Sequence, residues 1–174
     1  MFSKQYTSLK ILVYSLLCIF CYILQSADLP FMRFLGTAPE LLLVLCLCVA
    51  YRESETFAAF FGLGAGLLND IVTENIVGMS AIFFMFLSFA IAVMLRTLLR
   101  NFFTTYIFTV LAAVLGFLLI EYVFHCIFID AIPLWSALIN TILPKLFFTG
   151  VLAYPLYFIT GLFEKKLWPG GENA

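Results

Sequence analysis

The sequence predicts an all-α membrane protein with six transmembrane helices, and three observations lead to this fold class. Hydrophobic residues make up 64% of the 174-residue chain and charged residues only 11%, whereas soluble globular proteins carry about 25% charged residues. The chain also contains 21 phenylalanines, more apolar bulk than a soluble core of this size could hide. Finally, charge-free windows of transmembrane length recur along it. We therefore expect residues 1–174 to form a single polytopic membrane domain.

Four of the predicted helices are delimited by charged residues. The charge-free windows 11–27, 75–95, 101–120 and 146–163 are each close to the ~20 residues that cross a bilayer. The first window follows positive charges, as in a signal peptide. Because the remainder of the chain is equally apolar, we interpret it as a retained first span.

The region between the first two of these windows allows two interpretations. Residues 41–51 and 56–69 are charge-free, but helices of that length reach only about 17 and 21 Å, short of a ~30 Å hydrocarbon core. They could form a re-entrant hairpin, or two full helices that extend past their charged ends. A hairpin would hold Arg52, Glu53 and Glu55 of "YRESE" near the midplane, at a cost of about 2.5–3.5 kcal/mol for each charge. Two full helices are therefore predicted.

Basic residues then predict the orientation. Helices are expected over residues 9–27, 36–51, 54–71, 77–97, 101–128 and 145–165. One side of this arrangement holds seven basic residues: Lys4, Lys10, Arg52, Arg96, Arg100, Lys165 and Lys166. The other side holds only Arg33 and Lys145, so both termini are predicted to be cytoplasmic. Residues 131–144, which contain Trp135, are expected to form a short amphipathic helix at the outer interface.

The stretch "GLGAGLLND" places Gly62, Gly66 and Asp70 four residues apart, along one face of a helix. Glycines at this spacing open a groove in which a second backbone can approach closely. Asp70 has two interpretations. It is an interfacial acid that meets water, or a structural acceptor that caps or pins a neighbouring element, for example through the backbone at Gly78.

These residues resemble the core pattern of the MreD family of rod shape-determining membrane proteins. In that pattern a proline followed by an acid or amide begins a helix, as Pro39 and Glu40 do here. A G-x-x-x-G helix that ends in aspartate follows, and a glycine stands eight residues later, as Gly78 does. The resemblance covers about residues 39–90. It departs at Glu74, where the family often has glycine, so the turn geometry after the third helix does not follow from the pattern.

The resemblance implies a non-enzymatic scaffold of the bacterial cell-elongation machinery in the inner membrane, with no cofactor. Its implied partner is an MreC-type single-span scaffold, through which it connects indirectly to MreB, RodA and a class B penicillin-binding protein. The implied fold is a compact bundle similar to the substrate-binding subunits of energy-coupling-factor transporters. That similarity leaves a substrate-binding subunit of a vitamin-type transporter as the alternative function. Nothing in the charge balance indicates nucleic acid as a partner.

Other chemistry-bearing residues give weaker indications. Cys18 and Cys21, and Cys46 and Cys48, are spaced like metal or redox motifs, but their apolar surroundings favour a role as small hydrophobic residues. Glu121 and His125 stand one helical turn apart and are expected to form a structural pair near the outer surface. The sequence contains no hydrolase, zinc-protease or phosphate-loop motif. Nothing in it supports a lipid or wall-precursor contact for Lys145.

Overall fold

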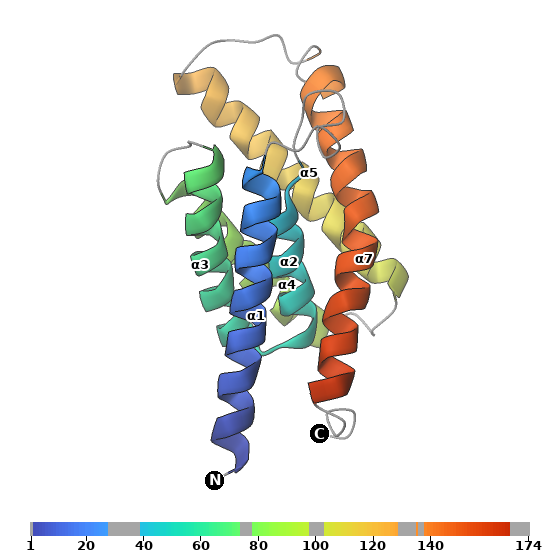
Figure 1. Cartoon of the computed structure of the whole chain (residues 1–174). Helices are drawn as coiled ribbons and strands as arrows, with labels where there is room; N and C mark the ends of the chain where they lie inside the picture. Colours follow the sequence, from blue (N-terminus) through green and yellow to red (C-terminus); the bar gives the residue numbers. More distant parts are fainter. Residues whose placement is uncertain are drawn as a thin grey trace.

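The computed structural model is a helical bundle that describes residues 2–27, 39–73, 78–97, 103–128, 135 and 138–167. Its α-helices are α1 (Phe2–Ser26), α2 (Leu41–Arg52), α3 (Glu55–Thr73), α4 (Met79–Thr97), α5 (Phe103–Phe128) and α7 (Leu143–Leu167). A π-helical turn, η1 (Leu138–Ile142), precedes α7. Each α-helix overlaps one of the expected segments. The start of α1 and the end of α7 lie at the same end of the bundle (Figure 1).

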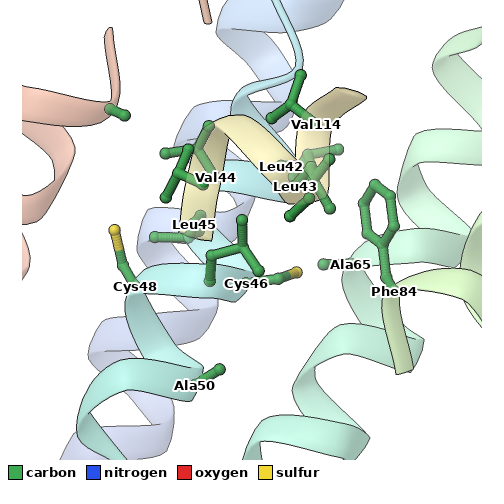
Figure 2. Close-up of a cluster of buried hydrophobic side chains, with 14 of the residues drawn as sticks. Leu42, Leu43, Val44, Leu45, Cys46, Cys48, Ala50, Ala65, Phe84 and Val114 are labelled. Atoms are coloured by element: carbon green, nitrogen blue, oxygen red, sulfur yellow. The ribbon is translucent and has the colours of Figure 1, made fainter. Parts of the chain in front are cut away.

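Helix α2 is the core of the bundle. Every residue from Leu41 to Ala50 is at most 3% exposed, so all sides of the helix are covered and not only one face. Its neighbours are α1, α3, α4, α5 and α7. Figure 2 shows one of these contacts, in which Cys46 of α2 points toward Ala65 of α3 beside Phe84 of α4. A 12-residue helix spans only about 18 Å, so α2 lies wholly within the length of its neighbours.

The "YRESE" segment forms a tight break between α2 and α3. Glu53 is extended, with φ −109° and ψ 176°, and the carbonyl of Ser54 accepts the first hydrogen bond of α3, from the N–H of Ala58. Glu53 pairs with Lys10 of α1 at 2.9 Å and accepts a hydrogen bond from Tyr14. The charged connection therefore lies beside the first half of α1.

Arg52 anchors the C-terminal end of α2 against α7. Its guanidinium lies 4.7 Å from the centroid of the Tyr157 ring and donates a hydrogen bond to the Tyr157 carbonyl. The side chain fits there because Gly161, one turn later, has no side chain: a Cβ at that position would lie 2.9 Å from Arg52 Nη2. A cation at a helix C-terminus also interacts favourably with the helix dipole.

Of the short amphipathic helix expected over residues 131–144, the structure describes Trp135, which is helical, and residues 138–144, so this expectation stays a prediction. Leu138–Ile142 form a π-helical turn that runs directly into α7. Pro144 falls in the first turn of α7. Because proline has no N–H to donate, a locally wider helix before it is a common accommodation. Trp135 is 74% exposed, and the other residues of 129–137 lie outside the described part of the chain.

Three of the described helical segments are long and apolar enough to cross a membrane: Leu9–Ser26, Tyr106–Phe124 and Leu143–Leu162. Shorter apolar segments are Leu41–Arg52 and Met79–Met94. The outer surface is also apolar, since Phe60, Phe108 and Phe147 on three different helices are each more than two-thirds exposed. A bilayer is the solvent that suits such a surface.

Candidate functional site

The glycine stripe of α3 packs against α4. A Cβ at Gly66 would lie 2.6 Å from the Ser80 carbonyl oxygen and 2.7 Å from the Ala81 nitrogen, and a Cβ at Gly62 would lie 2.6 Å from the Phe84 carbonyl oxygen. Real side chains do not approach backbone atoms so closely, so only glycine permits this helix spacing. The groove expected on this face is therefore occupied inside the bundle.

Asp70 joins the end of α3 to the start of α4. Its Oδ2 accepts a hydrogen bond of 2.7 Å from the Gly78 N–H, and its Oδ1 accepts one of 2.9 Å from the Ser80 N–H. Gly78 directly precedes α4 and Ser80 lies in its first turn, where N–H groups have no partner within the helix. With Asp70 only 1% exposed, its geometry is that of a structural acceptor and not of an acid in water. We call these contacts the Asp70 clamp.

Gly78 supplies the turn that the clamp closes. Its φ is +99°, in the region that residues with a Cβ rarely adopt. A Cβ there would meet no atom within 4 Å. The requirement for glycine at this position is therefore conformational, whereas at Gly66 it is steric.

Ser88 lies in the same contact between α3 and α4. Its side chain is fully buried, and its Oγ would lie 2.8 Å from a Cβ at Gly62. Within the described part of the chain, this oxygen has no hydrogen-bond partner. Burial of this oxygen without a partner therefore weakens the contact.

Glu40 is the N-cap residue of α2 and is held by two other helices, α1 and α7. Its carboxylate forms an ion pair of 2.6 Å with Lys145 of α7 and accepts a hydrogen bond of 3.3 Å from Gln25 Nε2 of α1. Its N–H donates to Thr149 Oγ, and the N–H of Leu42 donates to Gln25 Oε1. Because Glu40 makes no side-chain cap of its own, α2 is capped by residues from α1 and α7. Pro39, immediately before it, is also buried.

A chain of side-chain hydrogen bonds connects Glu40 to the Asp70 clamp. Gln25 Nε2 also donates to Asn69 Oδ1 at 2.8 Å, and Asn69 Nδ2 donates to Ser80 Oγ at 3.4 Å. The Ser80 N–H is in turn bound by Asp70. We call the whole set the buried polar network; it consists of Gln25, Glu40, Asn69, Asp70, Ser80, Glu121, Lys145 and Thr149. Its hydrogen bonds and ion pairs connect all six α-helices.

The expected pair of Glu121 and His125 is only partly described. Glu121 lies 3.4 Å from Lys145 and thus belongs to the buried polar network. His125 lies within α5, and its side chain is outside the described part of the structure. Lys145, which the sequence left without a role, is the cation between two carboxylates.

Four network residues were not singled out from the sequence: Gln25, Asn69, Thr149 and Ser80. A signal for them did exist, because isolated polar side chains within apolar spans are costly unless they are paired. What the sequence did not show is their pairing, since Gln25 and Asn69 are 44 residues apart.

The described residues offer little to a metal or a redox reaction. Cys18, Cys21, Cys46 and Cys48 are buried and free, and Cys48 Sγ lies 2.9 Å from the Tyr106 hydroxyl. Within the described ranges, no group of three or more His, Cys, Asp or Glu could hold a metal ion. The network's groups are bound to one another, which is an arrangement for positioning helices.

Comparison with known proteins places the chain by its sequence. A family model described as rod shape-determining protein MreD matches residues 5–167, which is most of the 174-residue chain. No curated protein and no solved structure matches the chain. The expected similarity to energy-coupling-factor subunits therefore stays a prediction.

Proposed function

We propose that this chain, which belongs to the MreD family of rod shape-determining proteins, is a non-enzymatic scaffold of the bacterial cell-elongation machinery. The single observation that carries the proposal is the family match over residues 5–167. The family is a membrane family and part of the MreBCD shape-determining system, so the chain has a role in rod shape determination.

The proposed mode of action is lateral binding of an MreC-type single-span protein. Almost all of the described chain is helical and apolar on its outside, which leaves little soluble surface for recognition. In a bilayer such surfaces associate through close packing and a few hydrogen bonds. Because the face of Gly62 and Gly66 is occupied by α4, the partner must use another face of the bundle. MreB, RodA and a class B penicillin-binding protein would then be reached indirectly.

We propose that the chain crosses the bacterial inner membrane six times, with both termini in the cytoplasm. The seven-to-two distribution of basic residues supports this orientation. The two ends of the bundle also differ in a way that fits it. Lys10 pairs with Glu53, and Arg52 lies against Tyr157, toward the end proposed to be cytoplasmic, whereas the buried polar network lies toward the other end. In this arrangement α2 is shorter than the bilayer core and is shielded from lipid by its neighbours.

The alternative function, a substrate-binding subunit of a vitamin-type transporter, receives no support from the comparisons. The matching family is described by its role in rod shape and not by transport. We therefore keep a single proposed function.

Depletion combined with co-purification tests the proposal. Rod-shaped cells that depend on this protein should become round when it is depleted, and a tagged copy purified in mild detergent should retain an MreC-type single-span protein. A tagged copy of an unrelated six-helix membrane protein, expressed at the same level, is the control. Normal cell shape after depletion, together with no retained single-span protein, would contradict the proposal.

A further inference from the structure

We propose that Lys145 is a positioning residue, which fixes the start of α2 by neutralising the buried carboxylate of Glu40. The inference rests on the proposed function only in that it concerns the Pro39–Glu40 segment of the family pattern. The position of the central helix α2 then depends on α7, because Glu40 and Lys145 are 105 residues apart in the sequence.

Helix α7 holds Glu40 at two points. Lys145 Nζ pairs with the carboxylate at 2.6 Å, and Thr149 Oγ accepts the Glu40 N–H at 3.2 Å. Lys145 and Thr149 are four residues apart and therefore lie on the same face of α7. Thr149 Oγ is itself fixed by donating to the Lys145 carbonyl at 2.6 Å. A side-chain contact and a backbone contact from one helix face define both the height and the rotation of the start of α2.

Burial makes the charge of Lys145 necessary. The Glu40 side chain is 1% exposed and that of Lys145 is 12% exposed, so neither can exchange its partner for bulk water. The other contacts of Glu40, from Gln25 and to Thr149, are made by neutral groups. Removing one partner of a buried ion pair leaves an uncompensated charge, which is far more damaging than removing both.

Glu121, the second carboxylate near Lys145, does not impose the same requirement. Its side chain is 26% exposed and lies 3.4 Å from Lys145 Nζ. A carboxylate with that exposure can be hydrated when the lysine is lost. The structure therefore makes an asymmetric prediction: neutralising Glu40 should compensate for the loss of Lys145, and neutralising Glu121 should not.

The test is a set of variants of the full-length protein, compared by thermal unfolding in detergent and by abundance in the membrane. Lys145→Met should lower the unfolding midpoint by about 10 °C. Adding Glu40→Gln to that variant should restore most of the loss, whereas adding Glu121→Gln should restore little. Lys145→Arg, which keeps the charge, should lie near the wild type. Lys10→Met is the matched control, because the pair of Lys10 with Glu53 is 29% and 15% exposed, and it should lower the midpoint only slightly.

Equal rescue by Glu40→Gln and Glu121→Gln, or no rescue by either, would overturn the inference, as would a loss in Lys145→Arg as large as in Lys145→Met. If Lys145→Met is too unstable to purify, the same ranking is read from the abundance of the double variants. The proposed function fails separately. The expected rescue pattern, found in a protein whose depletion leaves cell shape unchanged, would support the role of Lys145 and reject the role in cell shape.

Discussion

Asp70 Oδ2 accepts a hydrogen bond of 2.7 Å from the backbone N–H of Gly78, at a turn where Gly78 has a φ of +99°. The side chain at the end of α3 thus binds the residue whose conformation allows α4 to begin. Asp70 and Gly78, which stand eight residues apart in the family pattern, are therefore hydrogen-bonded to each other. The contact therefore predicts how much stability each substitution at these positions should cost.

Replacing Asp70 should be damaging in proportion to the acceptors that are lost. Asp70→Leu removes both acceptors and leaves the Gly78 and Ser80 N–H groups without them, at a cost of about 2–5 kcal/mol. Asp70→Asn keeps one acceptor but turns an amide donor toward the other N–H, so about 1–3 kcal/mol is expected. Thermal unfolding in detergent gives the ranking. A variant with asparagine that is as unstable as the one with leucine would show that the negative charge itself is required.

The glycines of α3 should differ sharply in their tolerance of alanine. Gly66→Ala would place a Cβ within 2.7 Å of the Ala81 nitrogen and force α3 and α4 apart, so a loss of about 2–4 kcal/mol is expected. Gly64→Ala is the matched control on the same helix, because a Cβ there meets nothing within 4 Å. It should be neutral or stabilising by up to about 1 kcal/mol. Similar unfolding midpoints for the two variants would contradict the close helix contact.

Gly78→Ala tests conformation without steric overlap. No atom lies within 4 Å of the added Cβ, but the φ of +99° is unfavourable for alanine, at a cost of about 1–3 kcal/mol. Gly116→Ala, at an open position of α5, serves as the control and should not destabilise the protein. Equal stability of Gly78→Ala and wild type would mean that this turn does not keep its left-handed conformation.

Ser88→Ala should leave the protein as stable as the wild type or stabilise it by about 1 kcal/mol. The substitution removes a buried hydroxyl that has no hydrogen-bond partner among the described residues, and burial of such a group is unfavourable. It should not rescue Gly62→Ala, since the Phe84 carbonyl would still lie 2.6 Å from the new Cβ. A clear loss of stability in Ser88→Ala would show that this hydroxyl makes a contact beyond those described.

The all-helical fold and the order of the helices could be predicted from the sequence, because charged residues separate its apolar windows. The charged "YRESE" segment, for example, separates α2 from α3, and its Glu53 pairs with Lys10. The helical turn before Pro144 was not predicted, because periodicity does not distinguish a π-helical turn from a separate interfacial helix.

The candidate site was predictable only where its residues are close in sequence. Asp70 and Gly78 belong to one short motif, so their contact could be anticipated from spacing. The pairing of Glu40 with Lys145 depends on the packing of α2 against α7, which no local pattern encodes. Gln25 and Thr149 act through the same long-range packing, and single polar residues do not identify their partners.

Cell shape is the measurement that tests the central claim most directly, namely that the contact between α3 and α4 supports a role in rod shape. Cells depleted of the native protein would carry Gly66→Leu or Gly64→Leu, with membrane abundance matched by induction, and their length-to-width ratio would be measured. We expect Gly64→Leu to restore rods, because that position is open, and Gly66→Leu to leave the cells round. Cells that stay rod-shaped after depletion would contradict the account. So would a Gly66→Leu variant that restores rods as well as Gly64→Leu does.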